Sequence, residues 1–256
     1  VNEEVMKCDL KIAIGSVVPH PMNGFGGGGK IILPGITSFE TTRDNHISFR
    51  EVARQPRDQR IVGMGIFDDN PMRRDLEEAA ELSGLDMMVN CLMNAWGETT
   101  AVFAGSLKPA YAATVEAAKG HYLTPAVTSK DVVIANTYTK ANEAGIGVAM
   151  AYRAVAPGGD VVLIANAPDG QVTHYLFGPF GKTTFALLGS AGRVPEHFGR
   201  LIVFTEYPDL ASRSGFGESD KMIFAHNWDD VLGLLEGRGA GTSVAVYPSA
   251  EIQYCQ

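Results

Sequence analysis

The sequence has few cysteines and few positive charges. Its three cysteines lie far apart, at positions 8, 91 and 255, which argues against a disulfide framework and favours a reducing compartment. Lysine and arginine together number 21 against 29 acidic residues, so the net charge is −8 and the isoelectric point is near 5.2. This acidic balance argues against nucleic acid or an anionic membrane as the main partner.

The sequence also lacks a long hydrophobic run and a signal peptide. No apolar stretch reaches the roughly 20 residues that span a bilayer, and the opening segment is acidic where a signal peptide would be basic. We therefore expect a cytoplasmic protein, and because the first residue is Val1 we expect the chain to begin inside a longer pattern. Its 256 residues, 45% hydrophobic and 20% charged, are typical of a globular protein of about two domains.

Glycine, by contrast, is concentrated in one stretch, HPMNGFGGGGK, which runs from His20 to Lys30. Five of its glycines lie within six positions, at 24 and 26–29. So dense a run loses much backbone entropy on folding, and a compact domain keeps it only where the chain turns sharply or approaches a ligand. The stretch therefore predicts a ligand loop, with His20 on one side and His46, sixteen residues beyond the lysine, on the other.

Two common kinds of site fit this loop poorly. Gly24 to Lys30 matches the G-x-x-x-x-G-K pattern of a phosphate-binding loop, but Ile31 stands where that motif needs a Ser or Thr for magnesium, and Pro34 interrupts any following helix. A zinc site is not indicated, because the two histidines are 26 residues apart with no cysteine or third histidine near them. A phosphate-loop nucleotide-binding protein is therefore the weakest alternative.

The spacing of His20, the glycine run ending in Lys30, Pro34-Gly35 and His46 resembles that of the nickel-dependent lactate racemase family. The resemblance implies a nickel-pincer nucleotide, pyridinium-3-thioamide-5-thiocarboxylic acid mononucleotide, which is joined to Lys30 through a thioamide. It also implies that His46 is the nickel ligand and that His20 is a catalytic acid/base.

These residue types suit that chemistry. A lysine amine can form a permanent acyl link, and Gly27, Gly28 and Gly29 would leave room beside it for a planar cofactor, so cofactor contacts are expected there. Neutral imidazole is a good nickel ligand, and the histidine pKa of about 6.5 lets a second imidazole exchange a proton at neutral pH.

The resemblance covers nearly all of the chain but begins inside the family's pattern. Family members carry, upstream of the glycine loop, a second acid/base histidine and contacts to the cofactor phosphate, and neither is found in this sequence. The opposing histidine is therefore expected from a missing upstream segment or from a partner chain.

Alternating strands and helices predict an α/β protein of two α/β domains with mainly parallel sheets, the first of them incomplete in this chain. The domains are predicted over residues 1–122 and 123–256. In the first we expect strands over 10–18, 86–94 and 99–104, a helix over 47–55, a helix capped by Asn70 with an apolar face at Leu76, Ala79, Ala80 and Leu82, and a helix over 108–119. In the second we expect strands over 131–136, 160–166, 221–225 and 242–247 and helices over 141–155 and 228–236, while 171–199 has no pattern that predicts an element.

The segment after the first strand of the second domain departs from the family. Lactate racemases have Gly-Tyr-Pro followed by a Gln-x-x-Lys that contacts substrate and cofactor, whereas this chain reads NTYTKANEAGIG. Tyr138 matches the family tyrosine, but Glu143 and Ile146 stand at the glutamine and lysine positions. Losing that lysine removes a charge-assisted contact of about 1.5–3 kcal/mol, which argues against lactate itself, and Lys140 is the candidate replacement cation.

By resemblance, the chain is expected to be a racemase or epimerase of a small 2-hydroxy acid. A hydride would move to and from the nickel-pincer nucleotide while histidines exchange the hydroxyl proton. The alternative that stays open is a non-catalytic or incomplete homologue, which keeps the loop but lacks a full site.

Overall fold

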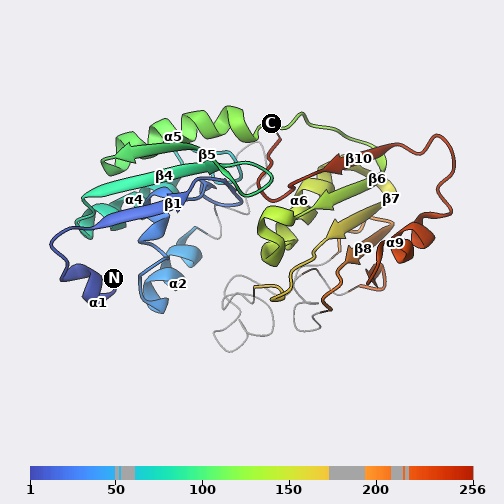
Figure 1. Cartoon of the computed structure of the whole chain (residues 1–256), viewed down its shortest axis with the longest axis horizontal. Helices are drawn as coiled ribbons and strands as arrows, with labels where there is room; N and C mark the ends of the chain where they lie inside the picture. The colour runs from blue at the N-terminus through green and yellow to red at the C-terminus, as the bar shows by residue number, and fades with distance from the viewer. Residues whose placement is uncertain (50–51, 53–60, 173–193, 209–215, 217–218, 256) are drawn as a thin grey trace. The chain divides into compact units, whose positions relative to one another are not determined.

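The structure is a computed structural model, and it describes residues 1–49, 52, 61–172, 194–208, 216 and 219–255. These residues fall into two compact units, Val1–Leu123 and Thr124–Gln256 (Figure 1). The first contains a three-stranded sheet and the second a five-stranded parallel sheet, so the predicted α/β class with mainly parallel strands is confirmed. No helix in these ranges is long and apolar enough to cross a bilayer.

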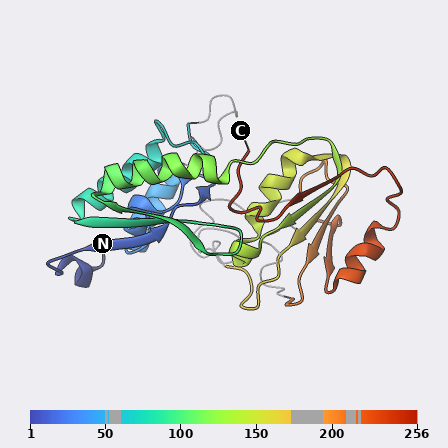
Figure 2. The same cartoon turned by 45° about the horizontal axis from the view of Figure 1, so that its top comes forward.

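The sheet of the first unit has the order β1-β4-β5. Its strands are β1 (Ile12–Ser16), β4 (Met87–Met93) and β5 (Thr99–Gly105), with β4 parallel to β1 and antiparallel to β5. Helix α5 (Leu107–Tyr122) packs on β4 and β5, and α4 (Pro71–Leu82) lies on the same side (Figures 1 and 2). Side chains that point to this covered face are buried: Ala13, Met88, Asn90 and Leu92. The predicted strands and the predicted α5 are therefore confirmed.

Helix α4 begins as predicted, because Asn70 caps it and Pro71 occupies its first position. The Oδ1 of Asn70 accepts from the backbone N–H groups of Met72 at 3.1 Å and Arg73 at 3.3 Å. The prediction of its apolar face is wrong at Leu82, because this side chain is 79% exposed. The buried row is Met72, Leu76 and Ala80, at intervals of four, and Leu82 projects from the opposite side of the helix.

The helix predicted after His46 begins earlier than expected. Helix α2 spans Phe39–Ser48, so His46 lies in its last turn. Ser38 caps α2 by accepting from the N–H of Thr41 at 3.3 Å. Apart from Phe39 and Ile47 near its ends, the residues of α2 are polar, so no apolar stripe marks this helix in the sequence. Residues 50, 51 and 53–55 of the predicted helix lie outside the described residues.

The sheet of the second unit has the order β10-β6-β7-β8-β9, with every neighbouring pair parallel. The strands are β6 (Lys130–Asn136), β7 (Val155–Ile164), β8 (Arg200–Phe204), β9 (Met222–Ala225) and β10 (Val244–Tyr247). Helices α6 (Gly145–Ala154) and α9 (Trp228–Leu235) cover opposite faces (Figure 2). Val162 of β7 packs with Val231 of α9, while its neighbour Leu163 meets Gly147 of α6. Alternate residues of one strand thus serve the two helical layers.

Three expectations for this unit need correction. The predicted helix over 141–155 is a 3-10 helix, η3 (Tyr138–Glu143), followed by α6, and Lys140 has non-helical backbone angles, φ −136° and ψ 51°. Strand β7 begins at Val155 and not at the predicted position 160, so Pro157, Gly158 and Gly159 lie within it at a register shift against β6. Strand β8 is not predicted from the sequence, because a short apolar run does not by itself distinguish a strand from a buried helical segment.

Asp160 joins three parts of the second unit. Its side chain is 2% exposed and accepts from Arg200 Nε and Nη2 at 2.9 and 2.6 Å. It also accepts from Arg238 Nε and Nη2 at 3.0 and 2.8 Å. Burial would raise the pKa of Asp160, but the hydrogen bonds and charges of the two arginines outweigh it and hold the pKa below its usual value.

We predict that Asp160→Asn destabilises the second unit and removes part of its acid sensitivity. The pKa of Asp160 is lowered in the folded state, so its stabilisation is present above the unfolded pKa of about 4 and is lost as pH falls toward the folded pKa. Breaking a buried pair costs about 3–5 kcal/mol, and the partly exposed arginines bring the expected loss to the lower end. Urea unfolding between pH 3 and 7 measures it. The exposed Asp220→Asn should change neither quantity.

Candidate functional site

The glycine loop consists of the second strand of a short hairpin and a single 3-10 turn. Two-residue strands β2 (Pro19–His20) and β3 (Gly24–Phe25) pair antiparallel, with His20 opposite Gly24. The turn η1 (Gly28–Ile31) then carries Lys30 in its last part and ends without continuing into an α-helix. Gly27 and Gly28 have φ values of 70° and 58°, in the left-handed region that favours glycine.

The chain's own packing requires these glycines. A Cβ on Gly28 would lie 2.7 Å from the ring of Tyr111, and one on Gly29 would lie 2.3 Å from the carbonyl oxygen of Leu76. A Cβ on Gly27 would lie 2.8 Å from the carbonyl oxygen of Ser16. The run therefore has a structural reason that is separate from any ligand, and the cofactor contacts expected at Gly27, Gly28 and Gly29 stay a prediction.

A buried tyrosine of α5 holds the loop by hydrogen bonds to its backbone. The hydroxyl of Tyr111 lies 2.8 Å from the carbonyl oxygen of Phe25 and 3.1 Å from that of Gly26, and its proton is donated to them. Burial raises the pKa of Tyr111 well above its usual value, so the hydroxyl stays protonated. This contact joins residues 86 and 85 positions apart in the sequence.

Two buried asparagines fix the loop at its other points. Asn90, on the central strand β4, is fully buried and its Oδ1 accepts from the N–H of Gly28 at 3.4 Å. Asn70 uses its Nδ2 to donate to the carbonyl oxygen of Met22 at 2.9 Å, in the turn that follows His20. The loop is thus held by side chains from a strand and two helices before any ligand binds.

Neither Tyr111 nor Asn90 is among the residues that the sequence predicts for the site. A signal existed for Asn90, because an amide at the centre of the apolar strand MMVNCLM is a polar group that must be paired when buried. No comparable signal marks Tyr111, since an aromatic residue on the buried side of an amphipathic helix is typical of any core.

Lys30 lies near enough to His46, in the same unit, for its charge to act on the histidine ring. Burial, and after it the nearby charge of Lys30, lower the pKa of His46 below its usual value, against an opposing hydrogen bond with Thr42. That hydrogen bond joins His46 Nδ1 to the carbonyl oxygen of Thr42 at 2.8 Å. A carbonyl can only accept, so Nδ1 carries the proton and the lone pair of the neutral ring lies on Nε2. This is how a protein usually orients a histidine for a metal.

His20 has the opposite tautomer. Its Nδ1 accepts from the backbone N–H groups of Met22 and Asn23, each at 3.2 Å. The neutral ring therefore carries its proton on Nε2. The amide of Asn23, which is 1% exposed, has neither its nitrogen nor its oxygen paired within the described part of the chain. A buried, unpaired amide beside a histidine is a position where a polar group of a ligand would restore the missing hydrogen bonds.

Tyr138 and Lys140 lie on η3 of the second unit, where strand β6 ends. Tyr138 is exposed, and Lys140 Nζ donates to Glu143 Oε2 at 2.6 Å. The candidate cation is therefore already paired with a carboxylate. The backbone N–H of Lys140 donates to Oε1 of the buried Glu251 at 2.8 Å, and burial raises the pKa of Glu251. The substrate roles of Tyr138 and Lys140 stay predictions.

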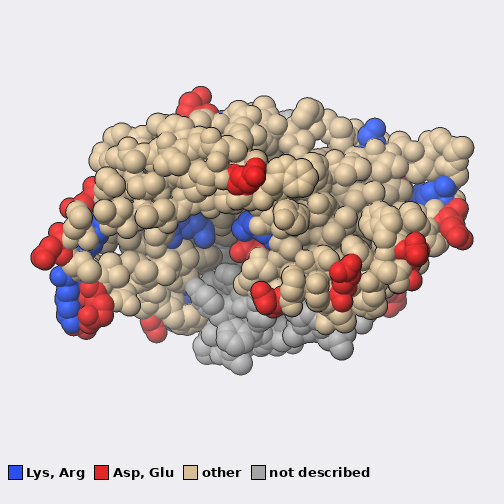
Figure 3. All heavy atoms as spheres, in the orientation of Figure 1, with Lys and Arg blue, Asp and Glu red and all other residues tan. Residues whose placement is uncertain are grey.

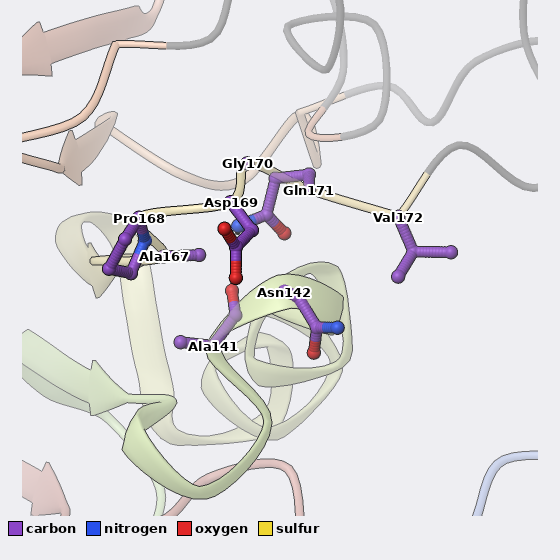
Figure 4. Close-up of a pocket in the computed structure, with 8 residues that line it drawn as sticks. All are labelled: Ala141, Asn142, Ala167, Pro168, Asp169, Gly170, Gln171 and Val172. Atoms are coloured by element: carbon purple, nitrogen blue, oxygen red, sulfur yellow. Dashed lines mark hydrogen bonds between the residues drawn. The ribbon is translucent and has the colours of Figure 1, made fainter.

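A cavity of about 300 Å³ opens next to η3. Figure 4 shows Ala141 and Asn142 on one side and the 167–172 loop, which follows β7, on the other. Gln171 joins the two segments, because its Nε2 donates to the carbonyl oxygen of Ala141 at 2.6 Å and its Oε1 accepts from the N–H of Ala144 at 3.0 Å. The cavity lies at the carboxyl ends of β6 and β7, where parallel α/β sheets usually bind ligands.

Comparison with known proteins relates this chain to lactate racemases. Residues 1–56 match the family model of the lactate racemase N-terminal domain. The lactate racemase of Thermoanaerobacterium thermosaccharolyticum is 32% identical over 111 residues, 43% of this chain and 25% of the relative. That of Lactiplantibacillus plantarum is 26% identical over 172 residues, 65% of this chain and 39% of the relative. The chain is therefore similar to lactate racemases, and its first 56 residues match their N-terminal domain.

Solved structures agree with the lactate racemase family in fold. The structure of the lactate racemase apoprotein from Thermoanaerobacterium thermosaccharolyticum matches 100% of this chain and 65% of its own, with a TM-score of 0.70 and 21% identity. A protein from Thermotoga maritima matches 100% of this chain and 69% of its own, with a TM-score of 0.66 and 19% identity. In sequence, the matched region of this chain spans between a quarter and two fifths of the two curated lactate racemases.

The residues present fit the nickel-pincer nucleotide of the lactate racemase family. Within the described residues there is no group of three or more His, Cys, Asp or Glu side chains that could hold a metal. A metal at His46 Nε2 would therefore need its other ligands from a bound group, and the neighbouring Lys30 is the side chain to which such a group would be joined. The unpaired amide of Asn23 adds polar atoms that a cofactor or substrate could satisfy.

We predict that Gly28→Ala destabilises the loop and that Gly26→Ala does not. Alanine at 28 would adopt a left-handed φ and would clash with the ring of Tyr111, which together cost about 1–3 kcal/mol or more. Gly26 has no left-handed φ, and its added Cβ would meet only ordinary contacts at 3.6 Å and beyond. Thermal unfolding of the two variants measures the difference, and equal effects would show that close packing does not explain the glycine at 28.

We also predict that Tyr111→Phe loosens the loop without unfolding the protein. The carbonyl groups of Phe25 and Gly26 lose their buried donor, at a cost of about 1–3 kcal/mol. Hydrogen exchange should rise in the peptide that covers 25–33. Tyr152→Phe, at an exposed tyrosine of the second unit, should leave that peptide unchanged. Unchanged exchange in Tyr111→Phe would show that the hydroxyl does not hold the loop.

Proposed function

We propose that this chain forms part of an enzyme that inverts the carbinol carbon of a small 2-hydroxy acid, using a nickel-pincer nucleotide. The observation that carries the proposal is the proximity of Lys30 to His46, whose Nδ1 donates to the Thr42 carbonyl and leaves the lone pair on Nε2. Similarity to lactate racemases supports the same reaction class.

Each of these residues has a defined task in this proposal. Lys30 Nζ would form the covalent link to the cofactor, and His46 Nε2 would be the protein's ligand to nickel. The lowered pKa of His46 favours the neutral ring, which is the form that binds a metal. When bound, the cofactor would supply a hydride acceptor and donor for the carbinol carbon.

His20 would donate a hydrogen bond from Nε2–H to the substrate oxygen. Because Nδ1 accepts from the backbone, Nε2–H donates, so His20 can hold and polarise a hydroxyl or keto oxygen. To act as a base at Nε2, the ring must move its proton to Nδ1, which requires the amides of Met22 and Asn23 to turn away. The acid/base role predicted for His20 therefore needs a small change in the turn that follows it.

The substrate class is proposed from the family alone. A 2-hydroxy carboxylate needs a cation for its carboxylate group, and Lys140 could serve only by exchanging Glu143 for the substrate. A partly exposed ion pair of this kind is worth about 1 kcal/mol, so the exchange costs little free energy. A substrate other than lactate agrees with the departure from the family's Gln-x-x-Lys.

A non-catalytic or incomplete homologue is the second candidate function. The observation that favours it is the departure from the family's Gln-x-x-Lys, since this chain has Glu143 and Ile146 at those positions. Such a protein would load the cofactor at Lys30 but would not racemise any 2-hydroxy acid by itself.

We predict that Lys30→Ala abolishes cofactor attachment and that His46→Ala mainly abolishes nickel retention. The chain is expressed together with the enzymes that make the pincer nucleotide, and intact mass and nickel content are measured. Lys30→Ala should lose both the mass adduct and the nickel, because the covalent link is gone. His46→Ala should keep the adduct and lose nickel by about ten-fold or more, since one ligand is removed.

The control is Lys108→Ala, at an exposed lysine of the same unit that pairs with Glu81, which should keep adduct and nickel. An unmodified wild-type chain under competent biosynthesis would overturn the proposal. Loaded protein that racemises none of a panel of enantiopure 2-hydroxy acids would favour the non-catalytic homologue.

A further inference from the structure

Helix α2, which carries His46, is buried through polar side chains. Its buried residues are Thr42 and Asn45. Its large apolar side chains, Phe39 and Ile47, are 37% and 38% exposed. Helices in proteins are usually held in place by an apolar stripe that packs on the core. The position of α2 therefore depends largely on polar contacts.

One of these polar contacts comes from another helix. Asn45 Nδ2 donates to Oδ2 of Asp75, on α4, at 2.6 Å, and the two residues are 30 positions apart in the sequence. Since the acceptor is a carboxylate, the bond is charge-assisted and roughly twice as strong as a neutral one. The hydroxyl of Thr42, in contrast, bonds to Ser38 and Thr37, which lie within five positions of it. Asp75 thus links α2 to a distant part of the chain.

The bond to Asp75 also determines how the amide of Asn45 lies. Asn45 is 5% exposed, and its Oδ1 has no hydrogen-bond partner in the part of the chain that the structure describes. Turning the amide over would place this oxygen against the carboxylate, where the two acceptors would repel each other. The observed orientation is therefore the one in which Nδ2 faces Asp75.

Helix α4 is a firm support for this contact. Its side chains Met72, Leu76 and Ala80 are at most 3% exposed, so the helix is fixed in the core. The acidic side chains that Figure 3 shows stand out on the surface, whereas Asp75 is half-buried. Partial burial leaves the bond less screened by salt than a bond at the surface.

The same helix supports the turn of Lys30. Helix α4 packs on η1, and a Cβ on Gly29 would lie 2.3 Å from the carbonyl oxygen of Leu76. Leu76 therefore meets the residue before Lys30. Asp75, its neighbour on α4, binds the residue before His46. Two consecutive residues of one helix thus hold the segments of both site residues.

We propose that Asp75 is a positioning residue, which fixes α2 through Asn45 and so keeps His46 close to Lys30. The proposal deepens the proposed function and rests on it for the role of His46 as the nickel ligand. Residues that support a metal ligand commonly change metal affinity by roughly 10- to 100-fold when they are altered. Because Asn45 is the donor, the role requires an acceptor oxygen at position 75.

Hydrogen exchange of the chain without cofactor tests whether Asp75 holds α2. Asp75→Ala removes the acceptor, so exchange in the peptide of residues 39–48 should rise about ten-fold. Asp75→Asn keeps an acceptor oxygen for Asn45 and should stay within about three-fold of the wild type. Glu78→Ala removes an exposed carboxylate from the same helix and should exchange as the wild type does. Circular dichroism and the melting temperature show that each variant is folded.

Nickel retention tests what this support does for the site. The chain is loaded by expression with the enzymes that make the pincer nucleotide, and a chelator is then added while nickel content and intact mass are followed. Asp75→Ala should keep the mass adduct and lose nickel about ten-fold faster than the wild type, and Asp75→Asn should restore slow loss. A purely structural role would lower the melting temperature and leave the rate of nickel loss from the adduct unchanged.

Two results would overturn the proposal. Unchanged exchange over 39–48 in folded Asp75→Ala would show that Asp75 does not hold α2. Raised exchange with unchanged nickel loss would show that this hold does not serve His46. A wild-type chain that carries no adduct would instead refute the proposed function, and the exchange experiment, which needs no cofactor, would still decide whether Asp75 fixes α2.

Discussion

Close packing of the glycine loop against its own chain is the constraint on which the site depends. There is no space for a side chain at Gly28 or Gly29, because the ring of Tyr111 and the backbone of α4 fill it. The loop is therefore preorganised: its carbonyls bind Tyr111, its amide at Gly28 binds Asn90, and Lys30 is presented beside His46. A lysine that carried a bulky group would benefit from such a support, because the entropy of ordering the loop is lost on folding and not on ligand binding.

Backbone contacts give the two histidines opposite chemistry. The Thr42 carbonyl accepts from His46 Nδ1, so the lone pair of this ring lies on Nε2, as a metal ligand requires. The amides of Met22 and Asn23 donate to His20 Nδ1, so this ring offers a proton at Nε2. Identical side chains thus present a lone pair at Nε2 in one case and a proton at Nε2 in the other, and the difference comes from whether a carbonyl or an amide faces Nδ1.

The departures from the family lie away from this loop. In the second unit, Lys140 is paired with Glu143, and the nearby cavity is bounded by η3 and the 167–172 loop. Cofactor attachment and substrate recognition are therefore separate questions for this protein. Retention of Lys30 and His46 bears only on the first.

Local signals determined the elements of the fold, and only the tertiary structure decided how they meet. The cap and proline at Asn70-Pro71, the alternation in β4 and the spacing of Lys30 and His46 are encoded within a few residues, so they could be read from the sequence. The sequence did not reveal the exposure of Leu82, the start of α2 or the hydrogen bond from Tyr111 to Phe25. Whether a side chain is buried, and which carbonyl it reaches across 86 positions, depends on the path of the whole chain.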